Sequence, residues 1–83
     1  KPVFLIEKTV IHEVRRFGKE NNHTALRFMK EGGEVVEAIS FFSTPLSWGV
    51  KVEAGESVSL LAYVEQSNFR GNREVRLRIV DVF

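Results

Sequence analysis

Cysteine is absent from this chain of 83 residues, and aspartate occurs once, as Asp81. A chain without cysteine forms neither disulfides nor thiolate metal sites, and this composition fits a reducing compartment such as the cytoplasm. No apolar run reaches the roughly 20 residues of a membrane-spanning helix, and no signal-peptide pattern is present. We therefore expect a cytoplasmic protein with no membrane partner.

Residues suited to catalysis are also scarce. The histidines are His12 and His23, which fall in separate predicted strands, and no glycine-rich phosphate-binding motif occurs. The carboxylates are mostly glutamates spread over strand faces and turns, so nothing supplies a nucleophile together with a base and a group to orient it. The sequence predicts no catalytic residue, no metal site and no cofactor within this chain.

The chain is rich in apolar residues that alternate with polar ones. Hydrophobic residues make up 43% of it and include seven phenylalanines, and alternation at every second position outweighs any helical pattern. A chain of this size has room for one small core. It starts at Lys1 and enters strand-like sequence almost at once, so we expect residues 1–83 to be a single domain cut from a longer protein.

The alternating segments predict five strands. The first of them changes register near residues 8–10, which indicates a bulge, and polar turns with glycine separate the others. We predict an all-β protein, a five-stranded OB-fold Greek-key barrel with a short helical segment between strands 3 and 4. The alternative is an SH3-like barrel, which normally lacks so long and curved a first strand. The predicted strands cover residues 3–17, 23–30, 35–42, 57–66 and 74–83.

The connection between the third and fourth strands breaks the alternation. Ser43 or Thr44 could cap a short helix that has Pro45 at its first position. Leu46 and Trp48 are the apolar side chains that could cover an end of the barrel.

Positive charge is concentrated in two segments although the net charge is only +1. Residues 15–30 carry a net charge of +4, residues 70–78 carry +3 and the rest of the chain carries −6. Such segregation is typical of nucleic-acid binders, and chance clustering on a solvated face is the alternative. In an OB-fold, ligands lie across strands 2 and 3 between the loops that join strands 1–2 and 4–5. We place these loops at residues 18–22 and 67–73, in the two basic regions.

Proteins that bind single strands combine cations along the phosphates with aromatic rings that stack on bases. The side chains that we predict to bind nucleic acid have one of these two properties. They are Arg16, Lys19, Arg27, Phe41, Phe69, Arg70 and Arg73.

Some aromatic and basic residues have two readings. Phe69 could stack on a base or fold back on the barrel. Either Phe41 or Phe42 must point outwards, because neighbours on a strand do not share a face. Trp48 fits a packing plug better than a base platform. The arginines at positions 76 and 78 could merely solubilise an outer strand face, and a tight turn with positive φ explains the glycine at 71.

Several segments resemble a known family. Residues 61–71 (LAYVEQSNFRG) and 75–81 (VRLRIVD) resemble the terminal hairpin of the OB domain in RecJ-type single-strand-specific DNA exonucleases of the DHH family. That hairpin has a tyrosine in the fourth strand, then asparagine, an aromatic, a glycine turn and an alternating strand with an acidic residue near its end. Gly18 with residues 23–28 (HTALRF) is similar to the family's glycine, turn and histidine, and residues 37–41 (EAISF) are similar to its third strand.

The resemblance implies an accessory domain of a nuclease. Enzymes of this family degrade single-stranded DNA from the 5′ end with manganese or magnesium, held by Asp/His motifs in separate catalytic domains, and this chain lacks those motifs. The implied partners are single-stranded DNA and the nuclease core of the parent protein. The hydrolase activity, the divalent metal and the role in DNA repair and recombination would belong to the parent.

Two other functions stay open. The chain could be a protein-interaction or structural OB module that docks on its own nuclease core or on a partner, with Phe69 and Trp48 as buried anchors. It could also bind RNA, because the sequence does not distinguish RNA from DNA as a ligand.

Overall fold

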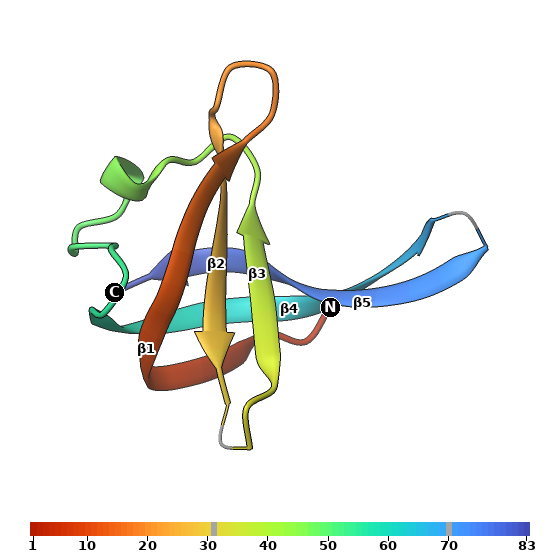
Figure 1. Cartoon of the computed structure of the whole chain (residues 1–83), viewed down its shortest axis with the longest axis horizontal. Coiled ribbons are helices and arrows are strands. Elements are labelled where there is room, and N and C mark those ends of the chain that lie inside the picture. The colour runs from red at the N-terminus through yellow and green to blue at the C-terminus, as the bar shows by residue number, and fades with distance from the viewer. Residues whose placement is uncertain (31, 70) are drawn as a thin grey trace.

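The computed structural model describes residues 1–30, 32–69 and 71–83, with every side chain in these ranges except those of Ser67, Phe69 and Glu74. Within these residues, five strands close into one barrel in the order β1-β2-β3-β5-β4 (Figure 1). The pairing of β3 with β5 is parallel and the other pairings are antiparallel. This arrangement confirms the predicted five-stranded OB-fold barrel. The strands are β1 (Phe4–Phe17), β2 (His23–Met29), β3 (Val35–Ser40), β4 (Ser57–Phe69) and β5 (Asn72–Val82).

Strand β1 closes the barrel because it pairs on both sides. Its first part pairs with β4 and its second part with β2. The register with β4 shifts between Ile6 and Thr9, where Lys8 takes a positive φ of 46° and its N–H donates to Ser59 Oγ at 3.1 Å. A bulge bends a strand and increases its twist. The predicted bulge near residues 8–10 is therefore confirmed, and it lets one strand curve around the barrel.

The interior follows from the alternation of apolar side chains along each strand. Thr24, Leu26 and Phe28 of β2 share one face of the strand and are all buried. Leu77 and Ile79 of β5 pack against the same core from the opposite wall. The buried core consists of Ile11, Leu26, Phe28, Ala38, Val52, Val58, Leu60, Ala62 and Val82.

The connection between β3 and β4 contains the short helix that was predicted, a 3₁₀ turn η1 (Pro45–Ser47). Thr44 precedes it, and the Thr44 N–H donates to Ser47 Oγ at 3.0 Å. Trp48 packs against the core as predicted. Leu46 is 94% exposed, so the prediction that it covers the barrel end is wrong. A single 3₁₀ turn sends successive side chains about 120° apart, and here Trp48 takes the inward position.

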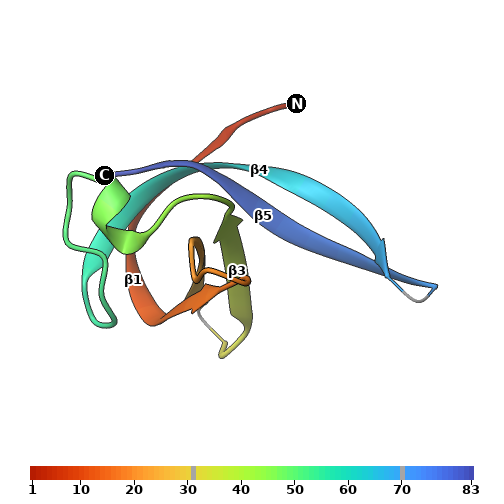
Figure 2. The same ribbon diagram turned by 90° about the horizontal axis from the view of Figure 1, so that it is seen from above.

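The β4–β5 hairpin is longer than the sequence indicated. Asn68 pairs with Arg73 and Phe69 pairs with Asn72, so the predicted loop at 67–73 is wrong and most of it is strand. Gly71 has a positive φ of 76°, as its place in a tight turn predicted. The hairpin projects beyond the barrel (Figures 1 and 2), which leaves Val75 63% exposed. Val75 shares a strand face with the partly buried Leu77, but it lies where the hairpin has left the barrel.

Candidate nucleic-acid interface

Cross-strand register assembles a basic surface on the outside of the barrel, which we call the outer face. Arg15 of β1 lies opposite Ala25 of β2, Ala25 lies opposite Ile39 of β3, and Ile39 lies beside Arg78 of β5. Ala25 and Ile39 are only 1% and 6% exposed although they face outwards. The outer face thus has a small apolar floor with arginines on both sides.

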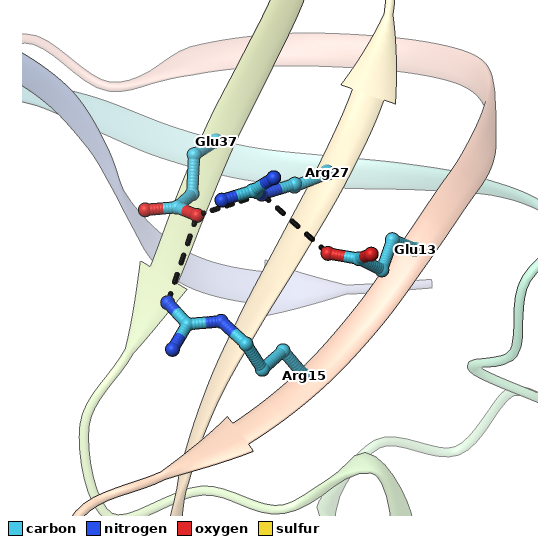
Figure 3. Close-up of polar contacts among 4 residues, drawn as sticks. All are labelled: Glu13, Arg15, Arg27 and Glu37. Atoms are coloured by element: carbon cyan, nitrogen blue, oxygen red, sulfur yellow. Dashed lines mark hydrogen bonds and ion pairs between the residues drawn. The ribbon is translucent and has the colours of Figure 1, made fainter.

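One end of the outer face carries four charged side chains from three adjacent strands (Figure 3). Arg27 Nε donates to Glu37 Oε2 at 3.1 Å and lies 3.6 Å from Glu13 Oε1. Arg15 reaches the same Glu37 oxygen at 3.9 Å. These side chains are roughly a third to a half exposed, and ion pairs of this kind contribute about 0–1 kcal/mol each. An anion could therefore replace these carboxylates at little cost.

A tighter cluster lies on β4 and β5. Glu65 accepts from Arg78 Nη1 at 2.8 Å and from Arg76 Nη2 at 3.2 Å. Burial acts to raise the pKa of the Glu65 carboxyl, but hydrogen bonds and positive charge from both arginines outweigh it and hold that pKa below its ordinary value of 4.5. The buried Nε of Arg76 has no hydrogen-bond partner among the described residues. The cluster keeps one positive charge in excess.

Phe41 lies between this arginine pair and an aromatic group. The guanidinium of Arg78 lies 4.4 Å from the centre of its ring. The rings of Phe17 and His23 lie 6.0 and 5.1 Å away in edge-to-face arrangements. Phe41 is therefore half-buried, while Phe42 is 79% exposed. Of the two neighbours, Phe42 is the one that points into solvent.

His23 is the centre of the aromatic group. Its Nδ1 accepts the N–H of Phe42 at 2.8 Å, and its ring is 4.7 Å from that of Phe42 and 5.2 Å from that of Phe17. Gly18 has a φ of +93°, and a Cβ there would lie 2.5 Å from His23 Cδ2. The glycine thus leaves the space that the histidine ring needs.

The residues predicted to bind nucleic acid fall into three places. Arg27 and Phe41 share the outer face. Lys19 is exposed in the 18–22 turn, and Arg16 is exposed beside it, with its Nε donating to Asn21 O at 2.8 Å. Arg16 pairs with the inward-facing Thr24, so its side chain starts from the opposite face to that of the outer-face arginines.

The remaining predicted residues belong to the hairpin. Arg73 is exposed near the start of β5, where it pairs with Asn68. The β4–β5 hairpin projects sideways from the barrel, whereas the 18–22 turn lies at the top of Figure 1. The side chain of Phe69 and the whole of Arg70 lie outside the described residues. The proposed roles of all these side chains stay predictions.

The outer face also contains residues that the sequence analysis did not select. The position of Arg15 could have been predicted from the apolar residue next to it. Val14 packs against the core, so its strand neighbour Arg15 must face outwards. Arg78 and Arg76 carried the same signal and were assigned only to solubility. Alternation left open whether Phe41 or Phe42 is exposed, and nothing in the sequence indicated the contact of Phe42 with His23, because this contact depends on a backbone turn after the end of β3.

Neither a metal-binding cluster nor a membrane-spanning helix occurs among the described residues. Over 1–30, 32–69 and 71–83 there is no group of three or more His, Cys, Asp or Glu side chains that could hold a metal ion. Nor do the residues that were searched include a helix with the length and apolarity to cross a membrane.

Comparison with known proteins agrees with this architecture. The chain is similar to the crystal structure of the SSB domain of a Synechococcus sp. protein, with a TM-score of 0.63 and 9% identity over 99% of this chain and 93% of that one. At this identity the likeness concerns the fold alone. No curated protein matches the chain. The family described as RecJ OB domain matches residues 1–81, and the chain therefore belongs to the RecJ OB domain family.

Proposed function

We propose that this chain is the single-stranded-DNA-binding accessory domain of a RecJ-type exonuclease that degrades DNA from the 5′ end. The observation that carries the proposal is the outer face, where exposed arginines flank an apolar floor and an aromatic group. Membership of the RecJ OB domain family supports it, and so does the fold shared with a domain described as an SSB domain. Catalysis and its manganese or magnesium belong, in this proposal, to other domains of the parent.

Binding would proceed by exchange of partners. Phosphates of the strand take the place of Glu37 and Glu13 beside Arg15 and Arg27, while Lys19 engages the backbone from the 18–22 turn and Arg73 engages it from the hairpin. The aromatic group offers ring surface to bases. Phosphate and stacking contacts do not read base identity, so sequence preference is weak.

The test is a titration of a labelled thymidine oligonucleotide at two salt concentrations. Binding should weaken as salt rises, with log K falling by roughly 0.7 for each phosphate neutralised per unit of log salt. The double variant Arg15→Ala, Lys19→Ala should lower this slope by about 1.4. Lys51→Ala is the matched control, because Lys51 is an exposed cation that pairs with Glu53 and Glu56 instead. Absence of binding at low salt would sink the proposal.

DNA is proposed over RNA because the family's enzymes act on single-stranded DNA. Matched DNA and RNA oligonucleotides of one sequence compare the two directly. Equal or tighter binding of RNA would favour an RNA-binding domain instead.

A second candidate function, docking on the nuclease core of the parent, is favoured by an apolar groove. β3 pairs with β5 at Ala38–Leu77 and Ile39–Arg78, and β5 runs on beside β4 into the hairpin (Figure 2). The groove beside this fork has a volume of about 990 Å³. Its lining includes Phe4, Leu5, Val35 and Val75, each at least half exposed. Exposed apolar surface of this kind is typical of protein contacts.

The docking function has its own experiment. Leu5→Glu should abolish binding of this chain to the separately produced nuclease core and leave oligonucleotide affinity unchanged. Val80→Glu is the control, since Val80 is 53% exposed but does not line the groove. If both variants bind the core equally well, the groove is not the docking surface.

A further inference from the structure

The turn that follows β3 holds a solvent-exposed aromatic ring on a strained backbone. Phe42 has a φ of +59°, in the left-handed region that bulky residues rarely adopt. Regular alternation would send its side chain inwards, on the side of the buried Ser40. The left-handed turn instead brings the ring onto His23, which faces outwards. Such outliers cluster at functional sites, where the surroundings maintain them.

Two consecutive residues of β2 hold this turn in place. His23 Nδ1 accepts the Phe42 N–H at 2.8 Å, and Thr24 Oγ1 donates to the carbonyl of Ser43 at 2.6 Å. Thr24 is fully buried, and Gly18 gives His23 its space. The left-handed backbone at Phe42 is thus fixed from both sides before any ligand arrives.

Phe42 also differs from the other aromatic rings around it. The guanidinium of Arg78 lies over the ring of Phe41, and Arg15 lies 5.4 Å from the ring centre of Phe17. Phe42 touches His23 with the two ring planes 83° apart, and it remains 79% exposed. An edge-to-face contact leaves open ring surface for a further stacking partner.

We propose that the turn at residues 41–43 is a nucleobase subsite, in which one base of a bound single strand stacks on Phe42. His23 is a positioning residue that holds the ring in place. Lys19, which directly follows Gly18 in the adjacent turn, is placed to meet a phosphate next to that base. The inference rests on the proposed function. It places on Phe42 a base contact that the sequence analysis predicted for Phe41.

The test compares Phe42→Ala and Phe42→Gly with Leu46→Ala in the oligonucleotide titration. Loss of one stacked base should weaken binding roughly 5- to 100-fold in both Phe42 variants. Leu46 is 94% exposed in the same connection, so its replacement should change nothing. Glycine tolerates the left-handed backbone, so Phe42→Gly should keep or raise the melting temperature while affinity falls. A merely structural role predicts a lower melting temperature instead.

An oligonucleotide with abasic sites separates stacking from other effects. It should bind wild type and Phe42→Ala with equal affinity, because the base that distinguishes them is gone. Phe42→Trp adds a second tryptophan to Trp48, and its emission should be quenched when thymidine oligonucleotide binds. Wild-type affinity in both Phe42 variants overturns the subsite and leaves the proposed function intact. Failure of the wild-type chain to bind any oligonucleotide overturns both.

Discussion

The absence of a side chain at Gly18 lets the His23 ring take its place at the centre of the aromatic group. The φ of +93° at Gly18 favours glycine, and so does the +91° of Gly55. They differ in what surrounds them, because a Cβ at Gly18 would meet His23 while a Cβ at Gly55 would meet nothing within 4 Å. The pair therefore separates the cost of a strained backbone from the cost of a steric clash.

We predict that Gly18→Ala destabilises the chain more than Gly55→Ala does. Both variants should lose about 1–2 kcal/mol of unfolding free energy through the left-handed backbone. Gly18→Ala should lose roughly 1–3 kcal/mol more, because the His23 ring must move. Urea unfolding measures the difference, and hydrogen exchange at the Phe42 amide should accelerate only in Gly18→Ala. Equal losses in both variants would mean that the ring moves aside freely.

At the residue scale, the sequence could predict which face of a strand a side chain lies on, but not where the backbone departs from the strand. Alternation showed that Phe41 and Phe42 point in different directions. It did not show which one is exposed, because β3 ends at Ser40 and Phe42 lies in a left-handed turn where strand alternation no longer applies. The sequence placed Gly18 in a turn and in a family resemblance, but the space that it leaves for His23 becomes apparent only when the strands are assembled.

At the scale of elements, the Glu65 cluster joins β4 to β5 at the base of the projecting hairpin. Glu65 is 20% exposed, and the two arginines are 26% and 32% exposed. Hydrogen bonds to charged groups contribute about 1.5–3 kcal/mol. The pKa of Glu65 lies below its ordinary value of 4.5, so the fold favours the carboxylate. Its contribution to stability is complete above pH 4.5 and is lost as the pH falls through the lowered pKa.

We predict that Glu65→Gln lowers the unfolding free energy by about 1–3 kcal/mol at pH 7. The difference from wild type should shrink as the pH falls below 4.5, because the wild-type carboxyl then becomes neutral as well. Urea unfolding of both proteins at several pH values measures this difference, and the titration of other carboxylates cancels between them. A difference that stays constant down to pH 2 would contradict the assigned cause.

Element boundaries could be predicted where apolar alternation is strong and less well where it is weak. Three of the four residues after Gln66 are polar and Gly71 follows them, which resembles a loop in sequence. The backbones of Ser67, Asn68 and Phe69 nevertheless pair with β5, because cross-strand hydrogen bonds continue the ladder beyond the barrel. The bulge in β1 was predictable, since a change of register in the alternation marks it directly.

At the scale of the whole molecule, charge segregation along the sequence translates only partly into a positive surface. Arg15 and Arg27 of the first basic segment and Arg76 and Arg78 of the second lie on one face, whereas Arg16 starts from the opposite face. Glutamates from β1, β3 and β4 reach the outer face, however, and they pair with four of these arginines. The charge counts along the chain could not show this, because Glu13, Glu37 and Glu65 lie outside both basic segments. They reach the outer face only through the pairing of the strands.

Removing one of these glutamates should therefore strengthen binding. Glu37 contacts both Arg15 and Arg27, and Glu37→Gln keeps its shape while it releases two cations for phosphates. We predict that affinity for a thymidine oligonucleotide rises about 2- to 10-fold at low salt and that the salt dependence becomes steeper. Glu53→Gln is the matched control, because Glu53 pairs with Lys51 rather than with the outer face. If both variants bind with the same affinity, Arg15 and Arg27 do not contact the strand, and the interface must be sought nearer the hairpin.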